Sequence, residues 1–519
     1  WQPWCLRSWI QDIDGDGVYT FTTSDLPAGD YATKVALNEA WDQSYGVGGG
    51  GDDVLFTVTA LGDIVTISYD TADNNVTVDV ATTGGGDVPA EIAALVNPPA
   101  RNPIQDDVFY FVMPDRFANG DTSNDTGGIT GDRLDHGFDP TDKGFFHGGD
   151  LNGMTAKLDY LAEMGITSIW MTPVFKNQPV QGSGDDISAG YHGYWYVDMT
   201  QFDPHFGTNA ELETLIEEAH ARDIKVFFDI ITNHTADVIT YEEGTFNYVS
   251  KADAPYLDAD GNEFDDREFA FGGDFPTLDP AISFPYTPIF EDPAHATLKV
   301  PAWLNDPTYY HNRGNSTFSG ENSLYGDFFG LDDLFTEHPD VVNGMIDIYK
   351  FWITNYDIDG FRVDTVKHVN IEFWQQFTPA ILDHAATEGK PDFFIFGEVF
   401  SGNQELLSYY TSRSEFPAVL DFGFQEQVRN YVSGNNGSDG MRDLFARDDY
   451  YTDADSNAYA LPTFIGNHDR GRFAHFLDVD NGVLADDEKL ARIQLAHAMM
   501  YFSRGVPVVY YGDEQGFVG

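Results

Sequence analysis

Residues 360–368 read GFRVDTVKH and combine a short apolar run with charged side chains. The stretch carries four ionisable groups near its end, namely Arg362, Asp364, Lys367 and His368. Arg362 and Asp364 are two positions apart, so on a strand their side chains point the same way. Because desolvating a charge is costly, a buried-looking strand that ends in such groups indicates a functional strand end.

The same kind of apolar strand recurs along the chain and alternates with amphipathic stretches. Eight strands are predicted, in DDVFYFVMPDRF (106–117), ITSIWMTPVF (166–175), IKVFFDIITNH (224–234), GFRVDTV (360–366), PDFFIFGEVF (391–400), AVLDFGF (418–424), YALPTFIGNHD (459–469) and GVPVVYYGDE (505–514). Alternating strands and helices imply a parallel sheet, and eight units predict an α/β (β/α)₈ TIM barrel over 101–519. An open doubly wound sheet would need a Gly-rich turn after the first strand, where MPDRFANGD stands instead.

Two irregularities interrupt this repeat. Residues 235–337, rich in Gly, Pro, Asn, Asp and aromatic residues, separate the third strand from its helix. This segment is too long for a plain loop and predicts an inserted subdomain. No eighth helix or C-terminal domain follows the eighth strand, so we expect that this chain alone does not close the barrel.

The N-terminal part has a different pattern. Residues 1–82 contain short β-branched runs separated by turn residues, which predicts a small β-sandwich, and the Gly-rich stretch 83–100 predicts a linker. QDIDGDGVYTF (11–21) begins like an EF-hand loop, but its twelfth position is Thr23, so we interpret it as an acidic β-turn. The single cysteine, Cys5, excludes an internal disulfide.

The charge balance limits the classes of partner that this protein is expected to bind. The chain has 27 Lys and Arg against 85 Asp and Glu, a formal net charge of −58. Nucleic acid and anionic membrane surfaces are therefore disfavoured. The excess negative charge fits either general solubility as a monomer or a salty habitat, where counter-ions screen self-repulsion.

Polar residues gather where the predicted strands end. The strand ends carry Asp229, Asn233, His234, Arg362, Asp364, Lys367, His368, Glu398, Asn467, His468 and Asp469. In a barrel these ends form one mouth, where carboxylates raise one another's pKa. Each group alone fits an ordinary core or rim role, whereas the whole set indicates a site. Two unequal carboxylates suit glycoside cleavage, and no HxH or HExxH motif at these ends supports a catalytic zinc.

Four segments, DIITNH, GFRVDTVKH, FGEVF and FIGNHD, resemble the four signature regions of the α-amylase family, glycoside hydrolase family 13. The resemblance implies Asp364 as nucleophile, Glu398 as general acid/base and Asp469 as the acid that stabilises the transition state. It also implies a set of substrate-binding residues, namely Arg362, His234, His468, Lys367, His368 and, in YHGYW, Tyr194 and His192.

The resemblance further implies calcium as cofactor. FFGLDDLF (328–335) resembles the region that ends the inserted subdomain, which suggests a site formed by Asn233, Asp333 and the main-chain oxygen of His368. DRFANGDTSNDTGG with HGGDLNG resembles a first-loop site of cyclodextrin glucanotransferases. Its ligands would come from Asn119, Asp121, Asn124, Asp125, Gly148 and Asp150. The alternative for this loop is an ordinary Asn/Asp/Gly turn.

The N-terminal segments SWIQDIDGDGVYTFTT and KVALNEAWDQSYG resemble small β-sandwich modules of bacterial pullulanases and amylopullulanases. For Trp41 and Tyr45 in this module we expect core packing rather than sugar stacking.

The expected activity is retaining endo-hydrolysis of α-1,4-glucosidic bonds in starch-like α-glucans. Glucan transfer or cyclisation stays open because Phe329 falls where cyclising relatives place a central aromatic residue, although we favour a core role for it. Pullulan cleavage is a further alternative. A non-catalytic starch-binding relative is disfavoured because all three acids are present.

The expected location follows from the substrate. The chain opens on WQPWCLRSWI without a signal peptide and has no apolar run long enough to cross a bilayer, so it is either cytosolic or already processed. Because a starch-like polymer cannot enter a cell, we predict a secreted protein.

Overall fold

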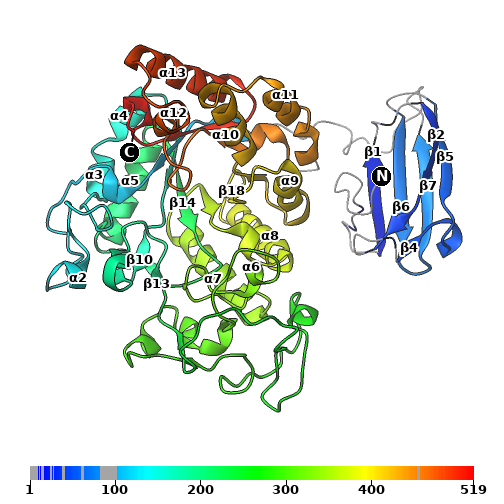
Figure 1. Ribbon diagram of the computed structural model, residues 1–519, viewed down its shortest axis with the longest axis horizontal. Helices are drawn as coiled ribbons and strands as arrows, with labels where there is room; N and C mark the ends of the chain where they lie inside the picture. Colours follow the sequence, from blue (N-terminus) through cyan, green and yellow to red (C-terminus); the bar gives the residue numbers. More distant parts are fainter. Residues whose placement is uncertain are drawn as a thin grey trace. The chain divides into compact units, whose positions relative to one another are not determined.

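The computed structural model describes residues 10–81, except 11, 13–16, 24–25, 27, 38–40, 42 and 60–62, and residues 102–518, except 453–455 (Figure 1). The proposed linker and Cys5 lie outside the described residues, as do Asp14 and Asp16 of the acidic turn. The larger compact unit comprises Asn102–Asp448 and Ala458–Gly519, and the N-terminal module belongs to a separate unit.

The N-terminal module is all-β, as predicted. Its strands are β1 (Val18–Thr23), β2 (Gly29–Thr33), β3 (Val35–Ala36), β4 (Ser44–Tyr45), β5 (Val54–Val58), β6 (Ile64–Asp70) and β7 (Asn75–Ala81). They form antiparallel sheets in the orders β1-β6-β7, β2-β5 and β3-β4. Tyr45 stacks on the core residue Tyr69 with ring centroids 5.8 Å apart. The prediction for Trp41 was wrong, because this residue is 44% exposed.

All eight predicted barrel strands are present. They are β8 (Phe109–Val112), β9 (Ser168–Met171), β14 (Lys225–Ile230), β17 (Gly360–Val363), β18 (Phe394–Gly397), β19 (Ala418–Val419), β20 (Pro462–Phe464) and β21 (Val506–Tyr510). Every pairing between them is parallel, in the order β19-β18-β17-β14-β9-β8-β21-β20. The near-closed ring is that of a TIM barrel, and its strands are fully buried because helices cover their outer face.

We expected that the eighth strand would not close the barrel, and this expectation was wrong for the pairing of the eighth strand. β21 pairs with β8, so the first and last strands are joined without an eighth helix. The break in the ladder falls between β19 and β20, where the N–H of Asp421 nevertheless donates to the carbonyl of Pro462 over 3.0 Å. The pairing of β21 with β8 therefore joins the eighth strand to the first, and the ring is nearly closed.

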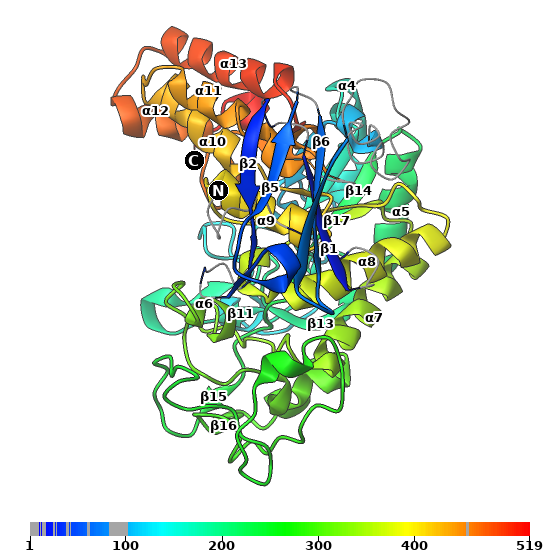
Figure 2. The same cartoon turned by 90° about the vertical axis from the view of Figure 1, so that its right-hand side faces the viewer.

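Helices surround the strands in Figures 1 and 2. They are α2 (Arg133–His136), α3 (Leu151–Thr155), α4 (Leu158–Glu163), α5 (Asn209–His220), α6 (Asn322–Tyr325), α7 (Pro339–Asn355), α8 (Ile371–Thr387), α9 (Gln404–Arg413), α10 (Phe422–Val428), α11 (Asp439–Phe445), α12 (Phe473–Asn481) and α13 (Asp486–Phe502). Local sequence sets their ends: α5 begins with a Thr208–Glu211 capping box, and α7 begins with Pro339 after the capping His338. No helix among the described residues is long and apolar enough to cross a membrane.

The loops of the larger unit contain additional short strands, which form three antiparallel pairs. The pairs are β10 (Phe175–Asn177) with β13 (Tyr196–Phe202), β11 (Val180–Gln181) with β12 (Ser188–Ala189), and β15 (Thr240–Tyr241) with β16 (Pro288–Ile289). The long insertion between β14 and α7 contains β15, β16 and α6 and forms a lobe at one end of the barrel (Figure 2). Its compact folding agrees with an inserted subdomain, while the exact domain boundaries stay predictions.

Candidate active site

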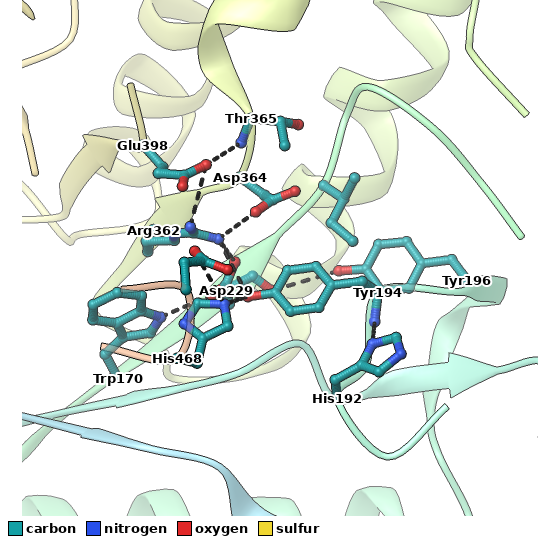
Figure 3. Close-up of polar contacts among 12 residues, drawn as sticks. Trp170, His192, Tyr194, Tyr196, Asp229, Arg362, Asp364, Thr365, Glu398 and His468 are labelled. Atoms are coloured by element: carbon teal, nitrogen blue, oxygen red, sulfur yellow. Dashed lines mark hydrogen bonds and ion pairs between the residues drawn. The ribbon is translucent and has the colours of Figure 1, made fainter. Parts of the chain in front are cut away.

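Strand β17 delivers Arg362 and Asp364 to the carboxyl end of the barrel (Figure 3). The N–H of Asp364 still donates to the carbonyl of Ile230 over 2.8 Å, so the sheet fixes this residue. Thr365 follows with φ +49°, a left-handed conformation that is unusual for a β-branched residue. This strained turn aims the N–H of Thr365 at Oε2 of Glu398, 3.0 Å away.

Arg362 joins the carboxylates of three strands. Its Nη1 lies 2.7 Å from Oδ1 of Asp364 and 2.7 Å from Oδ1 of Asp229. Its Nη2 lies 3.4 Å from Oε2 of Glu398. Arg362 is fully buried, and both Asp364 and Glu398 are nearly so. The guanidinium therefore contacts Asp364 more closely than Glu398, which favours Asp364 as the ionised partner.

Asp229 is a site residue for which the sequence analysis predicted no role. It is the penultimate residue of β14, and its Oδ2 accepts hydrogen bonds from Trp170 Nε1 at 3.0 Å and from the Tyr194 hydroxyl at 3.1 Å (Figure 3). Its position in DIITNH, among the polar strand-end residues, was the available signal. Asp229 accepts from the same Nη1 of Arg362 as Asp364 does and so acts as a positioning residue.

Asp469 and His468 complete the mouth from the loop after β20. His468 Nε2 lies 3.0 Å from the Tyr194 hydroxyl and 3.5 Å from Oδ2 of Asp469. The Asp469 side chain is 38% exposed, far more than Asp364 or Glu398. Asp469 therefore faces the open mouth, where it can reach sugar hydroxyls.

Burial sets the protonation of the surrounding groups. It lowers the pKa of His192, His234 and His468 to about 3 in each case, so these histidines are neutral at pH 7. Neutral imidazoles present one donor and one acceptor, which suits sugar hydroxyls. Burial also raises the pKa of Asp229 to about 6, although Arg362 opposes the shift.

The carboxyl groups compete for protons. Burial raises the pKa of Asp364 well above its usual value, Arg362 opposes the rise, and the charge of Glu398 adds to it. Burial likewise raises the pKa of Asp469. General acid and nucleophilic chemistry require one protonated and one ionised carboxyl, and the 2.7 Å contact of Arg362 with Asp364 favours the ionised form of Asp364 against the rise caused by burial.

The residues that follow β17 contact the insertion and the neighbouring strand ends. Lys367 Nζ donates to the carbonyl of Phe400 over 3.0 Å. His368 Nδ1 lies 3.0 Å from the Ser323 hydroxyl. His234 stacks on Phe328, with ring centroids 5.2 Å apart, and its buried Nε2 has no protein partner. These residues come from β17, the insertion and β14, so the insertion forms one wall of the mouth.

Several of the first-loop residues named in the calcium hypothesis contact one another. Oδ1 of Asp125 accepts from Asn119 Nδ2 over 2.7 Å, and a Cβ added to Gly148 would lie 2.5 Å from that oxygen. The Asn124 Oδ1 is buried without a hydrogen-bond partner. Asp150 accepts from the N–H groups of Gly120, Asp121 and Gly153. An unpaired carbonyl oxygen beside carboxylates is a donor set that fits calcium.

The other calcium hypothesis involves Asn233, Asp333 and the main-chain oxygen of His368. Asn233 and Asp333 lie on adjacent segments, where the N–H of Leu334 donates to the carbonyl of Asn233 over 2.8 Å. Oδ2 of Asp333 contacts His311 Nδ1 at 2.6 Å. His311 Nε2 in turn contacts Oε2 of Glu337 at 2.9 Å. The His368 ring contacts Ser323 of the insertion, and a role for the His368 main-chain oxygen stays a prediction.

The expectation that Phe329 belongs to the core of the insertion was wrong. Phe329 is 78% exposed and has φ +55°. Its ring lies 4.6 Å from that of Phe318 and 5.1 Å from that of Phe328. An exposed aromatic cluster next to His368 and His234 is a surface on which a sugar ring can stack.

Two buried carboxyl groups outside the mouth predict how stability depends on pH. Burial raises the pKa of Glu337 to about 8 and that of Asp513 to about 7. Because these folded-state values exceed the unfolded ones, the stabilisation is complete below about pH 4 and is lost as pH rises through 7 and 8. We expect the Tm of the calcium-free protein to fall by several degrees between pH 7 and pH 9, above the titration range of histidine.

Calorimetry in chelator at constant ionic strength tests this dependence. Glu337→Gln should flatten the slope, and Glu405→Gln, an exposed residue on α9, should leave it unchanged. A Tm that rises over this range in the unaltered protein would contradict the assignment of both groups.

At the strand ends of this barrel one arginine contacts three acids, and two neighbouring carboxyl groups are what glycoside cleavage requires. Residues 111–519 match the family described as "Alpha amylase, catalytic domain", and this chain belongs to that family. Residues 1–76 match "Pullulanase X25 domain".

Individual relatives agree with this membership. The chain is 51% identical over 432 residues to an "Alpha-amylase" of Streptomyces lividans, covering 83% of this chain and 47% of that protein. It is 31% identical to a "Cyclomaltodextrin glucanotransferase" of Thermoanaerobacterium thermosulfurigenes, covering 80% of this chain and 50% of that protein. The chain spans about half the length of these relatives.

Solved structures show the same fold. The α-amylase of Geobacillus thermoleovorans complexed with acarbose matches with a TM-score of 0.58 and 30% identity, covering 81% of this chain and 73% of that one.

Proposed function

We propose that this chain hydrolyses internal α-1,4-glucosidic bonds of starch-like α-glucans with retention of configuration. The observation that carries the proposal is the contact of one buried arginine with two carboxylates from neighbouring strands, Asp364 and Glu398. Retaining cleavage needs one ionised carboxylate and one proton donor at the same bond. The tighter contact of Arg362 with Asp364 assigns the ionised role to Asp364 and the proton to Glu398.

The reaction takes place in two displacements. An Asp364 oxygen attacks the anomeric carbon while Glu398 gives its proton to the leaving glucosyl oxygen, which forms a covalent glycosyl-enzyme. Glu398 then takes a proton from water, whose oxygen attacks the same carbon and releases Asp364. Asp469, with neutral His468 and Tyr194, holds the hydroxyls of the distorted sugar.

Product analysis on amylose and on pullulan tests the proposal. Linear maltooligosaccharides from amylose with pullulan untouched would support an α-1,4 endo-amylase. Maltotriose from pullulan would indicate α-1,6 cleavage, and panose would indicate α-1,4 cleavage within it. A lack of any product from amylose would refute the proposal.

Calcium is part of the proposed function. Asn119, Asp121, Asn124, Asp125, Gly148 and Asp150 would hold one ion, and Asn233, Asp333 and the His368 carbonyl would hold another. The support is the orphaned Asn124 oxygen and the convergence of Asp125 with Gly148. Calcium would supply positive charge that ties these loops to the barrel, and it also keeps the nearby carboxyls ionised.

Chelation should destabilise the protein. We expect EDTA to lower the Tm by about 10 °C and added calcium to restore it, because a ligand that binds only the folded state stabilises it. Asp125→Ala should reduce the calcium-dependent part of this shift, whereas Asp185→Ala, on an exposed turn, should not. Equal Tm values with and without chelator in the unaltered protein would refute both sites.

Glucan transfer or cyclisation is a second candidate, favoured by the exposure of Phe329. A sugar chain that stacks there can be held close to the glycosyl-enzyme and replace water as acceptor. Phe329→Ala should lower the ratio of transfer to hydrolysis on amylose by about 10-fold. A change of this size is expected because the variant loses roughly one stacking contact with the sugar. Phe271→Ala, an exposed phenylalanine elsewhere in the insertion, is the matched control. An unchanged ratio would argue against this role.

Secretion and a monomeric state remain parts of the proposal. They are supported by the polymeric nature of the substrate and by the net charge of −58.

A further inference from the structure

A cavity of about 640 Å³ lies in the insertion, apart from the residues of the catalytic mouth. Three segments line it: the loop around residues 273–280, the turn at 306–309 and the start of α7. The side chains that matter are Asp274, Phe275, Asp306, Tyr309, His338 and Asp340. Its volume falls within the roughly 300–1,000 Å³ of small-ligand sites.

Two half-buried aromatic residues, Phe275 and Tyr309, belong to the apolar part of the lining, together with one leucine and three prolines. Phe275 is anchored by Phe335, with ring centroids 5.5 Å apart, and by His338 at 4.1 Å. The ring of Tyr309 lies 5.0 Å from that of His338 in an edge contact. The aromatic rings are thus held by packing while part of their surface faces the cavity. Such rings stack on the apolar face of a sugar.

The polar groups of the lining provide hydrogen-bond donors and acceptors for the hydroxyl groups of a ligand. His338 Nδ1 accepts from the N–H of Asp340 over 3.1 Å, so its neutral ring carries the proton on Nε2 and offers a donor. Burial lowers the pKa of His338 to about 4, which keeps it neutral. The Tyr309 hydroxyl donates to Asp340 over 3.3 Å, which fixes both groups. The exposed Asp274 forms no hydrogen bond or ion pair within the described residues and offers a free acceptor.

The charge of the lining selects the ligand class. Three carboxylates with no lysine or arginine among the lining residues disfavour an anion. The lining residues, all within the described part of the chain, contain no group of three or more His, Cys, Asp or Glu arranged to hold a metal ion. A neutral ligand rich in hydroxyls, with apolar ring faces, satisfies both the acids and the aromatic residues.

The topology puts this cavity on the catalytic side of the barrel. The insertion follows the carboxyl end of β14, and α7 begins where the insertion ends. The loops between a strand and its next helix lie at the same barrel face as the active site. A long polymer can therefore contact the cavity and the mouth on one face.

We propose that this cavity binds a short stretch of α-glucan chain, as a second carbohydrate site separate from the catalytic mouth. The inference rests on the proposed function, because only a polymer substrate gives the site a use. Its role is to keep the enzyme on an insoluble or branched glucan between cleavage events.

Adsorption to granular starch tests the site in a Glu398→Gln background, which does not degrade the granules. Tyr309→Ala should weaken adsorption about fivefold, as expected for the loss of one stacking platform. Asp274→Ala should weaken it about threefold, and because Asp274 is exposed this variant should keep the wild-type Tm. Phe351→Ala, 39% exposed on α7, is the matched control and should adsorb normally.

Turnover by enzymes with Glu398 intact separates the two proposals. Hydrolysis of maltotriose, which occupies the mouth alone, should stay at wild-type rates in the cavity variants, while hydrolysis of granules should fall about threefold or more. Normal adsorption and normal granule hydrolysis by both variants would overturn the cavity site and leave the proposed function standing. Failure of the unaltered enzyme to cleave any α-glucan would overturn the proposed function instead.

Discussion

Replacing Asp364 by Asn is expected to lower kcat on amylose by at least about 10⁴-fold, because the amide cannot form the glycosyl-enzyme. The substitution is nearly isosteric, and the amide oxygen can still accept from Arg362, which now lies 2.7 Å from the carboxylate. The loss therefore reports chemistry and not collapse of the site. Steady-state kinetics with a reducing-sugar assay measure it.

Azide distinguishes a nucleophile from a merely structural acid. In Asp364→Ala the vacated space admits azide, which attacks the anomeric carbon from the same side and yields a β-glucosyl azide, the inverted product. Asp347→Asn, an exposed residue on α7, should keep wild-type kcat. An Asp364→Asn enzyme that retains a tenth of the activity would exclude Asp364 as the nucleophile.

Replacing Glu398 by Gln is expected to lower kcat on amylose by about 10²–10⁴-fold while leaving glucan binding intact, because proton transfer is removed but the shape is kept. The Thr365 N–H can still donate to the amide oxygen at the position of Oε2. Isothermal titration with maltoheptaose checks the binding.

A substrate whose leaving group needs no protonation tests whether Glu398 acts as the general acid. An α-maltosyl fluoride needs no protonation, so Glu398→Gln should still react with it and accumulate a glycosyl-enzyme visible as an added mass on the intact protein. Glu405→Gln on α9 is the matched control. If turnover of amylose by Glu398→Gln were unaltered, the assignment of the acid/base would be lost.

The sequence by itself determined the strands of the barrel and the residues at their ends. Apolar runs such as those of β14 and β17 report burial directly, because a strand covered on both faces contains few polar residues. The order of the signature segments also placed Asp364, Glu398 and Asp469 on three separate strand ends. These features are local, and they can be detected without knowing what each strand contacts.

The tertiary structure alone decided which side chains from different strands contact one another. The contacts of Arg362 with Asp229 and Glu398, the left-handed turn at Thr365 and the pairing of β21 with β8 depend on strand register, whereas the contact of Arg362 with Asp364 was expected from their spacing. The exposure of Phe329 depends on how the insertion packs. Sequence periodicity states whether a residue is buried, but contacts between residues more than a hundred positions apart arise only when the sheet closes, and so the electrostatics of the site could not be predicted from the sequence.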